Sequence, residues 1–275
     1  MELKNQLLTA IDLAIRAGKA ILDLYSKDDL DIAFKPDISP LTQADLASHR
    51  LIVNGLCRMT PTLPVLSEES KTISYENRKD WERFWMVDPL DGTKEFIKRN
   101  GEFTVNIALI GWGAPLVGVV HAPALGVTYY ACRGNGAFRQ KIGEAPSRIA
   151  VDTCTDRKFR IVASRSHASP MLGQFLKGIG DYECVSMGSS LKFCLVAEGS
   201  AYLYPRLGPT MEWDTAAGQC IVEEAGGTVT TLSGTRLRYN KCDLANPDFV
   251  VSAGNRYHWQ DYIDNSPNLK PEATD

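Results

Sequence analysis

The sequence predicts a protein of class α+β and α/β, with an antiparallel sheet in its first part, and three observations support this. Two amphipathic helical segments open the chain, at about 2–25 and 42–59. Strand-like segments then follow one another between 102 and 141 with Gly, Pro and Asn between them, as in an antiparallel meander. After about residue 155, strand-like and helical segments alternate, which is typical of α/β proteins. We therefore expect an N-terminal α+β domain at 1–155 and a C-terminal α/β domain at 156–275.

The elements can be justified in chain order from local patterns. The first helix is amphipathic because apolar residues recur at helical spacing while charged residues interrupt them. The second begins after Thr42, a common N-cap residue. An extended piece at 63–66 follows, and 84–87 reads as a buried strand that stops at Asp88-Pro89. Further strands are expected at 102–110, 116–120, 127–131, 137–141, 160–163, 182–186, 201–204, 228–231 and 249–252, and further helices at 169–178, 189–198 and 215–225.

The composition is that of a folded protein with a slight acidic excess. Lys and Arg number 30 against 33 Asp and Glu, which excludes a general nucleic-acid binder. The chain has four His, and its seven Cys form no C-x-x-C pair, so oxygen ligands are expected for any metal. No membrane-length apolar stretch and no signal peptide is visible. We therefore expect a cytoplasmic protein with reduced, mostly buried thiols.

The hexapeptide Asp88–Thr93 (Asp-Pro-Leu-Asp-Gly-Thr) is the sharpest local feature. Such a turn can bring two carboxylates together, and Gly92 permits a close approach of the backbone to a ligand. If a helix begins at Thr93, its free N–H groups can bind a phosphate. On the hexapeptide alone a structural interpretation is preferred, with Asp91 as a helix N-cap and Asp88 as a turn residue.

Two further acidic positions favour a metal site. Glu68 and Glu69 follow a strand-like segment, and Asp214 lies at the start of a helix of small residues, where it could also be an N-cap. Several buried carboxylates without a cation would repel one another and raise their pKa values. Oxygen ligands with open positions suit Mg²⁺ that is bound partly through a substrate phosphate, and two such ions can assist phosphoryl transfer.

Three separated segments, 66–69, 85–93 and 213–218, carry a family resemblance. They resemble motifs of the inositol monophosphatase superfamily of Mg²⁺-dependent, lithium-sensitive phosphatases. Segments 91–106 and 188–199 are similar to the 3'(2'),5'-bisphosphate nucleotidases of that superfamily. The resemblance implies a layered αβαβα sandwich of the inositol monophosphatase and fructose-1,6-bisphosphatase type.

The resemblance also implies roles for individual residues. Mg²⁺ would be the cofactor, and its ligands would be Glu68, Asp88, the carbonyl group of Leu90, Asp91 and Asp214. Asp45, which by itself reads as a solvated helix residue, would pair with Thr93 as the catalytic group that orients the attacking water. The substrate would be bound by Glu68, Asp91, Gly92, Thr93, Lys94, Ser166, His167, Ser189, Ser190, Lys192, Arg206 and Asp214. Lys192 and Arg206 could instead be ordinary surface charges, and His167 could cap the next helix.

The function implied by the resemblance is Mg²⁺-dependent hydrolysis of adenosine 3',5'-bisphosphate to AMP and phosphate, in support of sulfur assimilation. Action on 3'-phosphoadenylyl sulfate stays open. The alternatives are an inositol or sugar phosphate monophosphatase and, more distantly, a non-catalytic nucleotide-binding protein. The expected partner is a small bisphosphonucleotide, with no nucleic-acid polymer and no transmembrane segment. A peripheral contact with the cytoplasmic face of the inner membrane is left open, as is the choice between monomer and homodimer.

Overall fold

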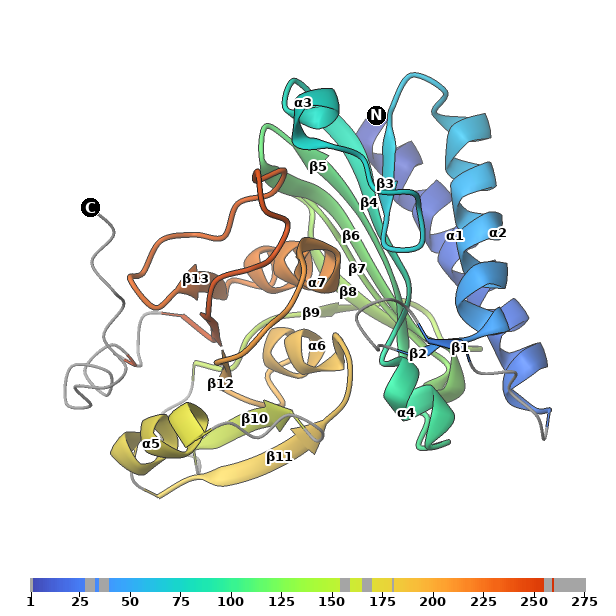
Figure 1. Cartoon of the computed structure of the whole chain (residues 1–275). Helices are drawn as coiled ribbons and strands as arrows, with labels where there is room; N and C mark the ends of the chain where they lie inside the picture. Colours follow the sequence, from blue (N-terminus) through green and yellow to red (C-terminus); the bar gives the residue numbers. More distant parts are fainter. Residues whose placement is uncertain are drawn as a thin grey trace.

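Five layers of secondary structure make up the protein, which we describe from a computed structural model for residues 2–27, 33–34, 40–153, 159–164, 170–179, 181–254 and 259. Two long helices cover one face of a seven-stranded sheet, and two shorter helices cover its other face (Figure 1). A five-stranded sheet packs below the shorter helices, and one more helix lies on its far side (Figure 1). This arrangement confirms the predicted layered αβαβα fold.

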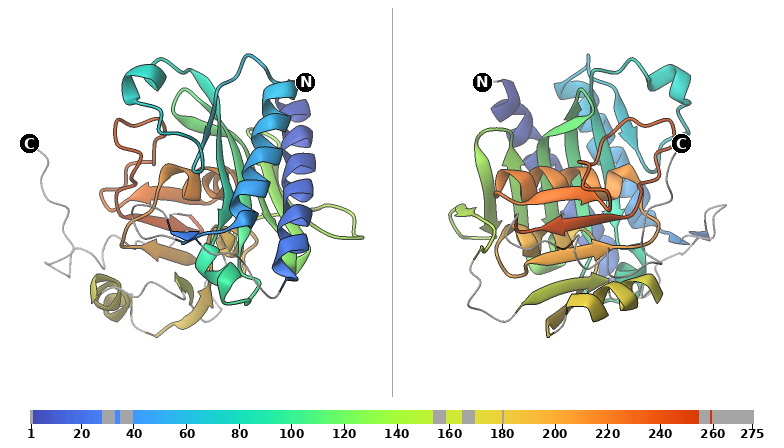
Figure 2. Two further views of the ribbon diagram at one scale, coloured as in Figure 1. Left: turned by 45° about the vertical axis from the view of Figure 1, so that its right-hand side comes forward. Right: turned by 90° about the vertical axis from the view of Figure 1, so that its left-hand side faces the viewer.

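The outer helical layer consists of α1 (Glu2–Tyr25) and α2 (Gln43–Met59), which run side by side along the sheet (Figure 2). The buried stripe of α1 includes Ala10, Leu13 and Ala17, at the spacing that the sequence predicts. Thr42 is the N-cap of α2, as predicted, and its side chain accepts a hydrogen bond from the backbone N–H of Ala44 at 3.2 Å. Both predicted helices are thus confirmed within a residue or two.

The seven-stranded sheet has the order β3-β4-β5-β6-β7-β8-β9 and confirms the predicted meander. Only β3 and β4 are parallel, and the other neighbours are antiparallel. Its strands are β3 (Val65–Ser67), β4 (Arg83–Asp91), β5 (Thr104–Gly111), β6 (Ala114–Ala122), β7 (Val127–Cys132), β8 (Gly136–Lys141) and β9 (Ser147–Ile149). Helices cover both faces of its centre, so every residue of β5 is buried. Val105 and Ile107 belong to the core below α1 and α2, and Ala108 belongs to the core below α7.

The second half of the chain builds the remaining layers around α6 (Leu191–Ala197) and α7 (Glu212–Glu224). The five-stranded sheet has the order β11-β10-β12-β14-β13. Its strands are β10 (Arg160–Ser164), β11 (Glu183–Met187), β12 (Leu203–Arg206), β13 (Thr228–Thr231) and β14 (Phe249–Ser252). The sheet is mixed, because β10 is parallel to β11 and β12 while β14 is antiparallel to its neighbours. Leu172 and Phe175 of α5 (Pro170–Ile179) pack on its far face.

One hydrophobic core joins the two halves of the chain. Phe84 of the first sheet, Cys220 of α7 and Val251 of the second sheet belong to the same buried cluster. The chain crosses from one sheet to the other after β9, near the boundary that the sequence suggests. The shared core shows that the layers are packed together, and the division into two domains at residue 155 stays a prediction.

Short elements complete the part of the chain that the structure describes. They are β1 (Ala33–Phe34), β2 (Pro40–Leu41), α3 (Tyr75–Arg78), α4 (Thr93–Ile97) and the 3₁₀ turn η1 (Pro123–Leu125). No helix among the described residues is long and apolar enough to cross a membrane. The expectation of mostly buried thiols is wrong for half of the six described cysteines: Cys57, Cys184 and Cys242 are exposed.

Two predicted boundaries next to the acidic motifs are wrong. β4 does not stop at Asp88-Pro89 but continues to Asp91, with irregular pairing to β5 between Asp88 and Asp91. Because Pro89 lies in that irregular stretch, its missing N–H interrupts no regular ladder bond. Helix α7 begins at Glu212 rather than Thr215 and has Met211 as its N-cap. Asp214 is therefore inside the first turn, where its Oδ2 accepts a hydrogen bond from the backbone N–H of Met211 at 2.8 Å.

Candidate active site

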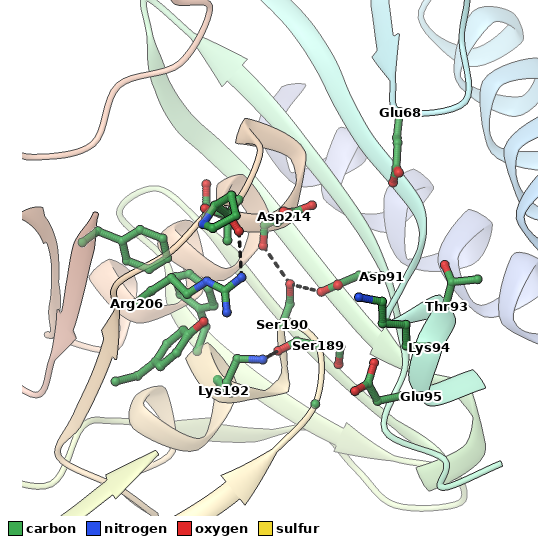
Figure 3. A pocket seen from close by; sticks show the side chains of 18 of the residues that line it. Glu68, Asp91, Thr93, Lys94, Glu95, Ser189, Ser190, Lys192, Arg206 and Asp214 are labelled. Atoms are coloured by element: carbon green, nitrogen blue, oxygen red, sulfur yellow. Dashed lines mark hydrogen bonds between the residues drawn. The ribbon is translucent and has the colours of Figure 1, made fainter. Parts of the chain in front are cut away.

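A cavity of about 250 Å³ lies where the end of β4 and α4 face α6, α7 and β12. It collects most of the predicted site residues, namely Glu68, Asp91, Gly92, Thr93, Lys94, Ser189, Ser190, Lys192, Arg206 and Asp214. Asp45, Asp88 and Leu90 are buried next to it. Ser166 and His167 lie outside the described residues. Figure 3 shows Glu68 and Thr93 on one side of the cavity, and Lys192 and Arg206 on the other.

The turn at Asp88–Thr93 is held by its own side chains. Oδ1 of Asp88 accepts a hydrogen bond from the backbone N–H of Leu90 at 3.1 Å. Gly92 is the N-cap of α4 with φ of 90°, a left-handed conformation that favours glycine. A Cβ atom there would lie 3.1 Å from the carbonyl oxygen of Glu102. Asp91 is therefore not the N-cap, and its side chain is left for contacts with the cavity.

The acidic side of the cavity concentrates negative charge. Burial, followed by the carboxylates of Glu68, Asp91 and Asp214, raises the pKa of Asp88 well above its usual range. Burial and Asp91 raise the pKa of Asp214 in the same direction. Carboxylates that repel one another in this way are stabilised by a cation, and an all-oxygen donor set suits Mg²⁺.

The described residues do not form a complete metal site by themselves. No three of their Asp, Glu, His or Cys side chains are already gathered closely enough to hold an ion. A cation here would need further oxygen ligands, such as the carbonyl group of Leu90 or a phosphate. The donor set therefore fits a divalent metal ion that is bound together with an anionic ligand.

Asp45 and Thr93 are in direct contact at one edge of the first sheet, as the resemblance implies. The hydroxyl group of Thr93 donates to Oδ1 of Asp45 at 3.2 Å. Oδ2 of Asp45 accepts from both the backbone N–H and the hydroxyl group of Thr42, at 2.7 and 2.6 Å. Only 2% of Asp45 is exposed, so the interpretation as a solvated helix residue is wrong. The hydrogen bond from the backbone N–H of Thr42 explains why Asp45 is not solvated, because through this bond the carboxylate also caps the first turn of α2.

The opposite side of the cavity is cationic and aromatic. Lys192 is buried, its ammonium group donates to the carbonyl oxygen of Ser189 at 2.6 Å, and it lies 5.4 Å from the centre of the Tyr204 ring. Burial lowers the pKa of Lys192 to about 8. Arg206 donates to the carbonyl oxygen of Pro209 at 2.7 Å. Because Lys192 is buried, it is not an ordinary surface charge.

Several residues in and near the cavity were not predicted from the sequence, among them Glu95, Tyr204, Phe249 and Asn106. Glu95, Tyr204 and Phe249 line it, and Asn106 lies buried behind Asp91. Nδ2 of Asn106 donates to the hydroxyl oxygen of Ser190 at 2.9 Å. The sequence feature that could have indicated Asn106 is a single polar residue within the apolar strand 105–110.

Two sheets and three helical layers, with carboxylates and cations gathered in one cavity, define a layered α+β protein with a charged site. The family model described as "Inositol monophosphatase family" matches residues 2–265. The chain therefore belongs to the inositol monophosphatase family.

Individual relatives agree with this family. The chain is 49% identical over 242 residues to 3'(2'),5'-bisphosphate nucleotidase CysQ of Escherichia coli K12, which covers 87% of this chain and 96% of that protein. It is 50% identical over 242 residues to the protein of the same name from Salmonella typhimurium, with the same coverage. Among solved structures, CysQ from Bacteroides thetaiotaomicron is 43% identical with a TM-score of 0.82, over 91% of this chain and 98% of that one.

Proposed function

We propose that this protein is a Mg²⁺-dependent phosphatase that removes the 3'-phosphate of adenosine 3',5'-bisphosphate and yields AMP and phosphate. The observation that carries the proposal is a single cavity that holds the carboxylates of Glu68, Asp91 and Asp214 together with the cations Lys192 and Arg206, with Glu68 on the opposite side from both cations (Figure 3). A bisphosphonucleotide has one phosphate for each side. The names of the similar proteins, 3'(2'),5'-bisphosphate nucleotidases, support the same reaction.

The acidic side would hold the metal ions. Glu68, Asp88, the carbonyl group of Leu90, Asp91 and Asp214 are the proposed ligands, and Mg²⁺ when bound supplies positive charge to the phosphate and lowers the pKa of water. The backbone of Gly92 and Thr93 would contact the phosphate oxygens, because Gly92 leaves the backbone accessible there.

Asp45 and Thr93 would prepare the attacking water. Since the Thr93 hydroxyl group donates its proton to Asp45, its oxygen is oriented to accept a hydrogen bond from that water. Thr42 holds the other oxygen of Asp45, so the carboxylate cannot rotate away from Thr93 without losing two hydrogen bonds. The pair thus acts as a fixed proton acceptor.

The cationic side would select the nucleotide. Lys192 and Arg206 would attract the 5'-phosphate, with Lys94, Ser189 and Ser190 as further contacts, and Tyr204 and Phe249 are apolar parts of the same cavity wall. The same charges suit 3'-phosphoadenylyl sulfate, whose sulfated 5' end is also anionic. We include this molecule as a second substrate, and we propose a role in the cytoplasm in support of sulfur assimilation.

Phosphate release distinguishes this proposal from its alternatives. We expect turnover of adenosine 3',5'-bisphosphate with Mg²⁺, inhibition by Li⁺, and 5'-AMP as the chromatographically identified product. Inositol 1-phosphate and fructose 1,6-bisphosphate serve as competing substrates under the same conditions. Equal or faster turnover of inositol 1-phosphate would contradict the nucleotidase function, and binding of the nucleotide without any turnover would favour a non-catalytic protein.

A further inference from the structure

Ser190 joins three elements of the site through its hydroxyl group. The hydroxyl oxygen lies 2.7 Å from Oδ2 of Asp91 on β4 and 2.8 Å from the carbonyl oxygen of Asp214 on α7. It also accepts a hydrogen bond from Nδ2 of Asn106 on β5 at 2.9 Å. The bonds from Ser190 to Asp91 and Asp214 are drawn in Figure 3. Only 2% of Ser190 and 1% of Asn106 is exposed, so water hardly competes for these contacts.

The number of protons determines the direction of these hydrogen bonds. The amide NH₂ of Asn106 can only donate, and it reaches Oδ2 of Asp91 at 3.4 Å as well as Ser190. Ser190 has one proton and two acceptors within reach, and an ionised carboxylate is the stronger acceptor. Asp91 thus receives hydrogen bonds on Oδ2 from two buried donors. Neither bond uses its Oδ1.

The hydrogen-bond partners of Asn106 determine which way its amide group points, and this orientation leaves one buried polar atom without a partner among the described residues. Because the amide NH₂ group faces Asp91, the amide oxygen must point elsewhere, and this buried Oδ1 accepts no hydrogen bond from the described residues. Asn106 also lies directly opposite Asp88 in the β4–β5 ladder. An apolar residue would fit a buried central strand without this unpaired oxygen. The asparagine is therefore explained by its donor group rather than by packing.

We propose that Asn106 and Ser190 are positioning residues that hold the carboxylate of Asp91 by its Oδ2, so that Oδ1 is available to a divalent cation. Since Ser190 also contacts Asp214, the pair couples the position of β4 to that of α7. The carboxylate of Asp91 and the backbone at Asp214 would then be held in place before any ion binds. This inference rests on the proposed function, because it takes Asp91 as a metal ligand.

The test measures binding of Mg²⁺ to the full chain by calorimetry, without and with inorganic phosphate, and turnover is a second readout. We expect Asn106→Leu and Ser190→Ala each to weaken Mg²⁺ binding about 10–100-fold, as for other residues that orient metal ligands. Tyr239→Phe is the matched control. It removes a buried 2.6 Å hydrogen bond to Gln219 and a longer one of 3.3 Å to Thr215, both on α7, and Tyr239 itself does not line the cavity. We expect it to lower stability and leave Mg²⁺ affinity unchanged.

A double variant distinguishes a positioning role from a general disturbance of the protein structure. If both residues act through one hydrogen-bonded unit, Asn106→Leu with Ser190→Ala should weaken Mg²⁺ binding by much less than the product of the two single effects. Single variants that bind Mg²⁺ within twofold of the unmodified protein would overturn the proposal, as would fully multiplicative effects. Ser190→Ala is a small change and keeps the test decisive if Asn106→Leu fails to fold.

The two proposals can fail separately. Mg²⁺ binding without hydrolysis of adenosine 3',5'-bisphosphate by the unmodified protein would overturn the proposed function while the positioning inference could still be confirmed. Hydrolysis by an unmodified protein whose Mg²⁺ affinity does not depend on Asn106 or Ser190 would overturn the positioning inference alone. Absence of Mg²⁺ binding in the unmodified protein would overturn the inference directly.

Discussion

Thr93 donates a hydrogen bond to Asp45 from 48 positions along the chain, and thereby connects the end of the first sheet to the start of α2. We expect Thr93→Val, which keeps the shape of the side chain without its hydroxyl group, to lower kcat by about 100-fold or more. Stability should change little, because the bond is long at 3.2 Å. The measurement is kcat with saturating nucleotide and Mg²⁺, together with urea unfolding.

Thr93→Ser is the matched control, because it retains the hydroxyl group and should retain most of the activity. Full activity in Thr93→Val would show that the hydroxyl group takes no part in catalysis. A parallel loss of activity and stability would instead show that Thr93 is structural.

Asp91→Asn should abolish turnover while the fold survives. Asp91 contributes to the raised pKa values of both Asp88 and Asp214, so its removal relieves repulsion in the metal-free protein. We expect the variant to gain roughly 1 kcal/mol in EDTA, equivalent to about 2–4 °C in Tm. Mg²⁺ should no longer raise that Tm. Thermal unfolding with EDTA and with Mg²⁺ measures both effects, and retained turnover would remove Asp91 from the metal site.

Lys192→Met should discriminate between substrates. The variant keeps an unbranched apolar side chain but loses the charged ammonium group, which lies 5.4 Å from the centre of the Tyr204 ring. A hydrogen-bonded charge contributes about 1.5–3 kcal/mol, so KM for adenosine 3',5'-bisphosphate should rise about 10–100-fold. Adenosine 3'-monophosphate, which has no 5'-phosphate, should be affected about twofold or less.

Lys98→Met, at the C-cap of α4 and outside the cavity lining, is the control for a general change of charge. Equal losses for the two nucleotides in Lys192→Met would assign Lys192 a structural role. An effect of Lys98→Met as large as that of Lys192→Met would point to long-range attraction rather than direct contact.

His121 should make stability depend on pH. It is buried against Gly18 of α1, hydrogen-bonds Thr128 at 2.9 Å, and burial lowers its pKa from 6.5 to about 4. Between these values the unfolded chain binds a proton that the folded protein does not bind. The free energy of unfolding therefore falls as pH falls through this window, by up to roughly 3 kcal/mol.

His121→Asn keeps a group that can bond Thr128 and removes the titration. Urea unfolding in EDTA at several pH values between 7 and 4 should show a shallower decline for the variant than for the unmodified protein. Parallel declines would mean that His121 is not the group responsible.

Local patterns were sufficient to predict much of the fold. Helix α1 follows from the spacing of its apolar residues, and the N-cap Thr42 follows from a side chain that can accept a hydrogen bond from the first turn of α2. Both signals involve residues that are close together in the sequence. The meander follows from short apolar runs separated by turn residues. The end of β4 was misplaced because the strand continues through irregular pairing with β5, and the start of α7 was misplaced because Glu212 is held by the backbone N–H groups of Asn240 and Lys241. These contacts are not local.

By itself, the sequence determined which chemical groups are present: a turn with two acids, further acids at Glu68 and Asp214, and few imidazoles. Only the tertiary structure decided what surrounds each group. It buries Asp45 against Thr93, places Lys192 against Tyr204, and sets Asn106 behind Asp91. The physical reason is that burial and hydrogen-bond partners determine the charge and orientation of a polar side chain, and here those partners come from distant elements on both sheets and the helices between them.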